Sequence, residues 1–297
     1  MQAPATLQST PAQTTVRQVA ITIDDVPRGG DGGSRRPADI MAMTRRLLQP
    51  LRDAHIPATG FVNAGHADSW PPAQFRALLD LWLDSGADLG NHTHSHLDIN
   101  VVPLDDYTAD IVRGEPPIRE ALEARGRRLT YYRHPFLFTG PTPEIKARLR
   151  AFLDARGYRV APVTIDNSDY QYAALYTTPK YRERVRREYV PYMESVVAFF
   201  ESRAVELTGR EFPQILLIHA SELNADLLPD LLAMFRRRGY EFVTLERALA
   251  DAAYELADDY VGKSGFSWIH RWSRAMKLPP RGEPDPPKWV QEAWAAR

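Results

Sequence analysis

Side chains capable of acid–base and metal chemistry follow short apolar runs at several places along the chain. An Asp24-Asp25 pair ends the run at residues 19–23, and His219 ends the run at residues 215–218. Three more groups lie between them: His92, His94 and His96; Arg133, His134 and Phe136; and Asp166, Asp169 and Tyr170. Carboxylates and histidines serve as general acids and bases and as ligands of divalent metals. These residue types therefore indicate metal-assisted hydrolysis.

The histidine run suggests a metal site. His92 and His96 are four residues apart, a spacing that lets both reach one ion from a helical turn, while His94 points elsewhere. Together with Asp25 they form a set of two histidines and one carboxylate, which leaves a coordination position open for water, as in catalytic zinc sites. Taken alone, the run is also typical of a polar loop or a helix cap.

The two adjacent aspartates suit different tasks. Successive side chains of a strand point in opposite directions, so we expect one carboxylate to bind a metal and the other to act on water. Taken alone, an Asp-Asp pair is more typical of a turn or a helix cap. Taken alone, His219 would be interpreted as a core histidine at the end of a strand, and Arg133 as a member of a surface ion pair.

The elements that must position these groups alternate between strands and helices. Each β-branched or aromatic run is followed by a segment with helical periodicity, which predicts a parallel sheet with covered faces and, with about seven units, an α/β barrel. The active site of such a fold lies at the carboxyl ends of the strands. Expected strands are 18–24, 58–63, 87–91, 129–133, 158–163, 214–219 and 240–243; expected helices are 38–54, 73–85, 104–125, 142–156 and 223–238.

Taken in order, these groups resemble the five motifs of the polysaccharide deacetylases, the NodB-homology or carbohydrate esterase 4 family. They read Thr22-Ile-Asp-Asp25, His92-Thr-His-Ser-His96, Arg133-His-Pro-Phe136, Asp166-Asn-Ser-Asp169-Tyr170 and Leu217-Ile-His219. The resemblance spans residues 18–254 and implies a distorted (β/α) barrel of about seven units.

The resemblance also implies roles for the residues. It assigns Asp25, His92 and His96 to one divalent metal ion, usually zinc, and Asp24 to the general base. Arg133 would orient that base, the Phe136 backbone N–H would bind the oxyanion, and His219 would be the general acid. Asp169, with Asp166 as second choice, would tune His219.

Physical chemistry adds two expectations about protonation. A nearby cation and Arg133 should lower the pKa of Asp24, and a carboxylate partner should raise the pKa of His219. Three positions depart from the family pattern: Tyr170 replaces the usual Trp and His134 the usual Pro, both at the expected substrate pocket, and Phe136 replaces the common Tyr.

We expect the chain to consist of three parts. Residues 1–17 are polar and form a flexible leader, residues 18–254 form the catalytic domain, and residues 255–297 form a Trp- and Pro-rich extension that packs its indoles on the barrel. Sugar stacking by one of these tryptophans is an alternative role. Residues 178–204 are expected to form a charged helix broken at Pro191.

Composition excludes several classes of protein. The absence of cysteine among 297 residues excludes disulfide scaffolds and sulfur-ligated metal sites, and a net charge of −1 argues against nucleic-acid binding. The apolar runs are far shorter than the roughly 20 residues that span a bilayer. We expect a secreted or periplasmic protein whose signal segment once preceded Gln2, with a cytoplasmic location as the alternative.

The sequence therefore predicts a metal-dependent deacetylase that hydrolyses an N-acetyl or O-acetyl group on a carbohydrate by attack of metal-bound water. The alternatives are a related hydrolase acting on a non-sugar amide or cyclic imide, a non-catalytic glycan-binding barrel, and an interaction module built on the Trp-rich tail. The oligomeric state is not predicted.

Overall fold

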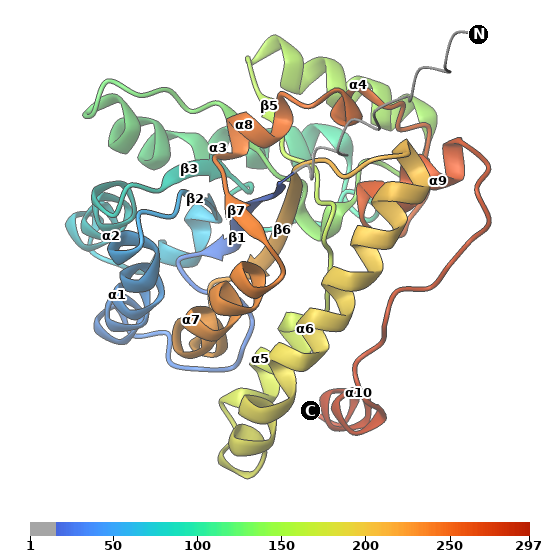
Figure 1. Ribbon diagram of the computed structural model, residues 1–297. Coiled ribbons are helices and arrows are strands. Elements are labelled where there is room, and N and C mark those ends of the chain that lie inside the picture. Colours follow the sequence, from blue (N-terminus) through green and yellow to red (C-terminus); the bar gives the residue numbers. More distant parts are fainter. Residues whose placement is uncertain (1–15) are drawn as a thin grey trace, which may run out of the picture.

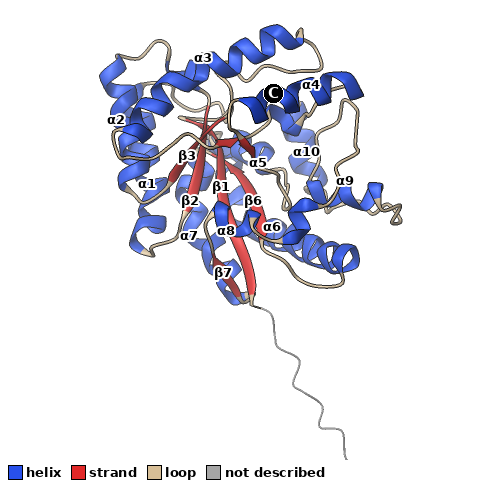
Figure 2. Ribbon diagram, turned by 90° about the horizontal axis from the view of Figure 1, so that it is seen from above, coloured by secondary structure: helices blue, strands red, loops and turns tan. Residues whose placement is uncertain are grey.

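A parallel β-sheet forms the centre of the protein in the computed structural model, which describes residues 16–297. The predicted leader, residues 1–17, lies outside the described residues except for its last two. The sheet has seven strands: six lie in the order β5-β4-β3-β2-β1-β6, and the seventh, β7, pairs with β1. Figure 2 shows β3, β2, β1 and β6 side by side. The strands are β1 (Arg17–Val26), β2 (Ala58–Val62), β3 (Asp88–Asn91), β4 (Tyr131–Tyr132), β5 (Arg159–Val160), β6 (Gln214–His219) and β7 (Tyr240–Phe242).

The sheet curls into a half-barrel. A single parallel bridge between Ile165 and Leu216 links the segment after β5 to β6 and so joins the two ends of the sheet. The predicted α/β barrel of about seven units is confirmed. Each expected strand is present, but β4 and β5 are only two residues long, whereas residues 129–133 and 158–163 were expected.

Helices cover the outside of the sheet (Figure 1). Several begin with Pro in the first turn, where a missing N–H costs no intrahelical bond. The larger helices are α1 (Pro37–Asp53), α2 (Pro72–Asp84), α3 (Leu104–Glu123), α4 (Pro143–Ala155), α5 (Asp169–Tyr176), α6 (Pro179–Thr208) and α7 (Glu222–Arg237); shorter ones are η1 (Ala64–Ala67), η2 (Pro135–Leu137), α8 (Leu245–Leu249) and η3 (Ala252–Glu255).

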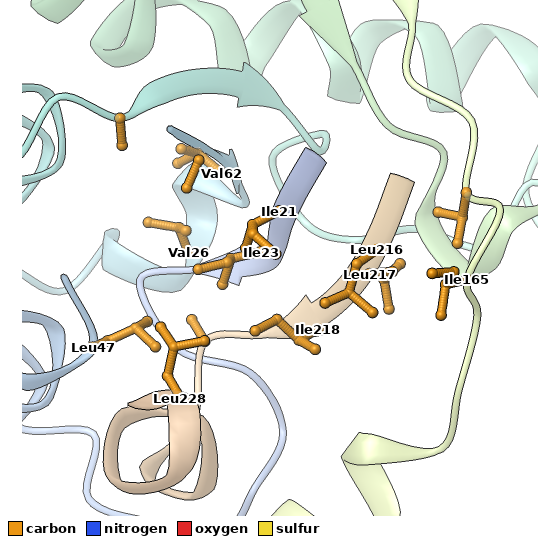
Figure 3. Close-up of a cluster of buried hydrophobic side chains, with 14 of the residues drawn as sticks. Ile21, Ile23, Val26, Leu47, Val62, Ile165, Leu216, Leu217, Ile218 and Leu228 are labelled. Atoms are coloured by element: carbon orange, nitrogen blue, oxygen red, sulfur yellow. The ribbon is translucent and has the colours of Figure 1, made fainter. Parts of the chain in front are cut away.

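The main core lies between the sheet and the outer helices. Ile23 and Ile218 from adjacent strands lie near Leu47 of α1 and Leu228 of α7 (Figure 3). All four side chains are inaccessible to solvent. Strands whose two faces are both covered read as continuous apolar runs, which is why β1 and β6 are recognisable in the sequence.

Helix α6 differs from the prediction, because it continues through Pro191 without a break. The residues on either side of Pro191, among them Tyr189, Tyr192 and Met193, are buried against neighbouring elements, while Pro191 itself faces solvent. Packing of this face compensates for the hydrogen bond that Pro191 cannot donate.

The chain beyond residue 255 adds α9 (Trp268–Ala275) and α10 (Lys288–Ala295), joined by a long extended segment (Figure 1). Trp268 and Trp272 of α9 are buried, whereas Trp294 of α10 is 40% exposed. Among residues 16–297, no helix combines the length and the apolar character that a membrane span requires.

Shortening Leu228 to alanine should destabilise the fold by about 2–5 kcal/mol, because it leaves a cavity between α7 and the sheet. Chemical denaturation measures this loss directly. Val205→Ala, at a position 42% exposed on α6, is the matched control and should change stability by less than about 0.5 kcal/mol. Equal effects of the two substitutions would contradict the assigned core.

Candidate active site

A pocket of about 700 Å³ opens at the carboxyl ends of the strands. Asp24, Asp25 and His219 line it from β1 and β6. Other predicted site residues also line it, namely His92, His96, His134, Phe136, Asp166 and Tyr170. Arg133 and Asp169 lie behind this lining, each fully buried and bonded to a residue that faces the pocket. The structure thus brings the five sequence motifs to one place.

The end of β1 separates the two aspartates. Asp24 still belongs to the regular ladder, opposite His219 of β6, but the pairing with β2 shifts between Ile23 and Val26. Asp25 has a positive φ of 62°. This irregularity turns both carboxylates toward the pocket, whereas regular alternation would send them to opposite faces. The expectation of divergent directions is therefore wrong.

The histidine run is a loop after β3 rather than the expected helical turn. Thr93 and His96 both have positive φ, of 68° and 53°. Asn91 holds the loop by accepting a hydrogen bond from the Thr93 N–H at 2.8 Å, and Thr93 Oγ1 accepts one from the His96 N–H at 3.0 Å. Loop geometry, not helical spacing, brings His92 and His96 together.

Asp25, His92 and His96 have the arrangement of a metal site. Asp25 Oδ1 lies 3.7 Å from His92 Nε2 and 3.5 Å from His96 Nε2, and the three donor atoms all lie within 4.8 Å of one another. Two ligand atoms that each lie about 2.1 Å from a tetrahedral ion are about 3.4 Å apart, which is close to the two distances from Asp25 Oδ1. Asp25 Oδ1 is buried and has no hydrogen-bond partner, so the site has a buried oxygen that a cation would satisfy.

The protonation states also fit a metal. Burial lowers the pKa of His92 well below its usual value and lowers that of His96, so both rings are neutral near pH 7. Burial raises the pKa of Asp25, but the positive charges of the nearby histidines in their protonated forms, His96 first and then His219, lower it by more. His92 Nδ1 lies 2.9 Å from the Arg133 carbonyl, which can only accept, so Nδ1 carries the proton and Nε2 has a free lone pair.

Asp24 forms a buried ion pair with Arg133. The Arg133 guanidinium lies 3.3 Å and 3.4 Å from the two carboxylate oxygens, donates to Thr22 Oγ1 at 3.0 Å and covers the Phe61 ring. In the metal-free protein, the charge of Arg133 alone does not lower the Asp24 pKa. Burial raises this pKa to about 6 and outweighs the opposing charge of Arg133.

His219 is paired with Asp169 rather than with Asp166. Its Nδ1 lies 2.7 Å from Asp169 Oδ1, and its backbone N–H donates to Asp169 Oδ2 at 2.8 Å. Burial lowers the pKa of His219, but the charge and hydrogen bond of Asp169 raise it by more, to about 10. The imidazole is therefore a cation near pH 7, as expected for a histidine with a carboxylate partner.

Asn224 is a positioning residue that the sequence did not reveal. Its amide donates to Asp169 Oδ2 and to the His219 carbonyl, both at 2.8 Å, and its oxygen accepts from Tyr189 at 2.8 Å. These bonds fix the Asp169–His219 pair from α7. Asn224 follows the N-cap Ser221 by three residues, a pattern common at helix starts that does not indicate a site.

The remaining predicted residues form the walls of the pocket. Burial, followed by the charge of Glu283, raises the pKa of Asp166 to about 7, and burial lowers that of His134 to about 3. Phe136 has a φ of 55°, and its ring packs edge-on against His96 at 4.3 Å. The Tyr170 ring lies 6.4 Å from that of His219.

Sequence comparison identifies the family. The model of the polysaccharide deacetylase family matches residues 12–160, about half of the chain. The chain belongs to this family. YheN of Bacillus subtilis strain 168, which carries a provisional name as a polysaccharide deacetylase, is 25% identical over 236 residues, covering 77% of this chain and 67% of YheN.

Solved structures share the fold. A mutant of BA3943 from Bacillus anthracis, described as a pseudoenzyme of carbohydrate esterase family 4, is 15% identical with a TM-score of 0.54, covering 78% of this chain and 67% of its own. The polysaccharide deacetylase Bc1974 of Bacillus cereus is 20% identical with a TM-score of 0.51, covering 76% and 91%. The peptidoglycan deacetylase PdaC of B. subtilis is 20% identical with a TM-score of 0.50, covering 81% and 95%. At these identities the likeness establishes the fold alone.

Zinc titration of chelator-treated protein should give one tight site per chain, because three ligands converge in their metal-binding protonation states. His96→Ala should lose most of this affinity. His94→Ala is the matched control from the same loop and should bind zinc as the wild type does, because His94 Nε2 is turned to Asp68 at 3.0 Å. Equal loss in the two variants, measured by calorimetry, would contradict the assigned ligands.

His219 should remain protonated well above neutral pH in the metal-free protein. Its pKa is raised on folding, so its contribution to stability is complete below about pH 6.5 and is lost as the pH rises toward 10. In Asp169→Asn, the largest contribution that raises this pKa is lost while the charges of Asp25 and Asp24 remain, so the pKa should fall below its wild-type value. Histidine NMR titration measures both values, and an unchanged pKa in the variant would show that Asp169 does not control this ring.

Proposed function

We propose that this protein is a metal-dependent hydrolase that removes an acetyl group from nitrogen or oxygen of a carbohydrate. The observation that carries the proposal is the convergence in one pocket of a three-ligand metal site, a buried carboxylate held by arginine, and a histidine held protonated by aspartate. Membership of the polysaccharide deacetylase family supports a carbohydrate substrate.

The proposed metal, which we infer to be zinc from its two-histidine, one-carboxylate ligands, would lower the pKa of a water molecule and polarise the acetyl carbonyl. Asp24 is positioned to act beside that site, since its Oδ2 lies 3.8 Å from His92 Nε2. With a pKa of about 6, Asp24 is mostly ionised at neutral pH and able to accept a proton from the attacking water.

Arg133 holds the base in place. Its hydrogen bonds to Asp24 and Thr22 fix the carboxylate orientation, and its charge offsets part of the cost of burying that carboxylate. Arg133 has no exposed surface, so it acts on the reaction through Asp24 rather than by touching the substrate. The Phe136 N–H is proposed as the donor to the oxyanion, as the family resemblance implies.

His219 is proposed as the general acid. Asp169 occupies Nδ1, so the Nε2 proton is the one available to the leaving nitrogen or oxygen. Because Asp24 must be ionised and His219 protonated, activity should rise through the Asp24 pKa and fall through the His219 pKa. In the metal-free protein the pKa of Asp24, about 6, lies below that of His219, about 10, so the two groups hold these protonation states together near pH 7.

Substituting Asp24 by asparagine should lower kcat/KM for acetate release by about 10²–10⁴-fold, because the proton acceptor is lost. The assay uses zinc-loaded protein with acetylated chito-oligosaccharides, acetylated xylan and an aryl acetate, each with and without chelator. Asp68→Asn is the matched control, since this carboxylate is 67% exposed and bonded to His94 outside the metal set. Undiminished release by Asp24→Asn would refute the mechanism.

The same panel separates the alternatives. Metal-dependent turnover confined to a non-sugar amide or cyclic imide would favour the amidohydrolase hypothesis. Metal binding with no turnover of any substrate would favour a non-catalytic glycan-binding barrel, a role made relevant by the likeness to a pseudoenzyme.

A further inference from the structure

The most exposed aromatic side chains among residues 16–297 gather at one pocket. They are Phe136 at 49%, Tyr170 at 44% and Trp294 at 40% exposure, and all three line the pocket of the proposed active site. Phe136 belongs to η2 and Tyr170 to the first turn of α5, both within the catalytic motifs, but Trp294 comes from α10, near the far end of the chain. Grouped exposed apolar side chains mark a binding surface.

Helix α10 is fixed firmly enough to present Trp294. Trp289 donates to Glu188 Oε2 at 2.7 Å, stacks near Tyr181 and is covered by the Arg184 guanidinium, while Val290 is fully buried. These contacts attach α10 to α6, and α10 also packs against α5. One tryptophan of this helix anchors it, and the other remains open to the pocket.

An aromatic row leads outward from the proposed acid. The rings of His219 and Tyr170 lie 6.4 Å apart, and those of Tyr170 and Trp294 lie 5.6 Å apart at nearly right angles. Phe136 lies beside the metal ligand His96 at 4.3 Å. The reacting centre therefore has an exposed aromatic surface next to its metal ligands and another next to its acid.

The C-terminal extension supplies polar groups to the same wall. Lys263, Ser264 and Glu283 line the pocket, and Gly265 lies so close to the Phe136 carbonyl that a Cβ there would be 1.7 Å from its oxygen. Only glycine fits that contact. Apolar faces with a few polar groups beside them match a sugar ring, whose C–H face is apolar and whose edge carries hydroxyl groups.

We propose that the C-terminal extension forms a second sugar-binding subsite, in which Trp294 stacks on a ring adjacent to the one that carries the acetyl group. This inference rests on the proposed function and specifies its substrate as an oligosaccharide of at least two rings. Continuity with the catalytic pocket favours a substrate over a protein partner, because Trp294 contacts Tyr170 rather than a separate surface.

The test measures how acetate release depends on chain length, using acetylated chito- and xylo-oligosaccharides of one to four rings. In the wild type, kcat/KM should rise from one ring to longer chains. Trp294→Ala should reduce that gain about tenfold through KM, and Trp294→Phe should restore most of it. Met276→Ala, at a position of the extension that is 49% exposed and away from the pocket, should keep the wild-type length dependence.

Binding to the Asp24→Asn protein separates this inference from the proposed function. Calorimetric titration with the same oligosaccharides should show affinity rising with length, and the rise should be lost when Trp294→Ala is added. If no substrate is turned over but this pattern is found, the subsite stands and the catalytic proposal fails. The subsite proposal would be overturned if affinity did not rise with oligosaccharide length, or if it rose equally in Trp294→Ala. It would also be overturned if Met276→Ala lost the length dependence as well, because the effect would then come from general disturbance of the extension.

Discussion

The break in the regular geometry of β1 after Ile23 is the constraint on which the site depends. A regular strand would turn only one of Asp24 and Asp25 to the pocket, but the positive φ of Asp25 turns both there. Asp24 stays in the ladder opposite His219, where Arg133 can reach it from β4's end. Asp25 leaves the ladder and meets the two histidines. Base and metal ligand thus come from adjacent residues and have different partners.

The pairing of the buried charges explains why a cation would bind at Asp25 rather than at Asp24 or Asp169. Asp24 is paired with Arg133 and Asp169 with His219, so each of these carboxylates has a charged partner. Asp25 faces histidines whose pKa values are lowered by burial, and one of its oxygens has no hydrogen-bond partner. A buried carboxylate among neutral imidazoles is costly unless a cation joins it. The same burial keeps His92 and His96 neutral, so that each ring has a nitrogen lone pair that can bind the cation.

The sequence predicted the strands and outer helices well because their apolar periodicity is local. It also singled out the residues of the pocket, since each follows a recognisable apolar run. It failed where the outcome depends on contacts made by distant parts of the chain. The continuation of α6 through Pro191 depends on packing, and the pKa of Asp24 depends on a depth of burial that no local pattern records. The positive φ of Asp25 and the place of Trp294 beside Tyr170 are likewise tertiary features.

The most direct test of this account is a crystal structure of the zinc-loaded protein with anomalous scattering measured at the zinc edge. The account predicts one strong peak about 2.0–2.2 Å from an Asp25 carboxylate oxygen and from Nε2 of His92 and His96, with Asp24 held by Arg133 outside the coordination sphere. A peak coordinated by Asp24 in place of Asp25, or no peak at this end of β1, would contradict it.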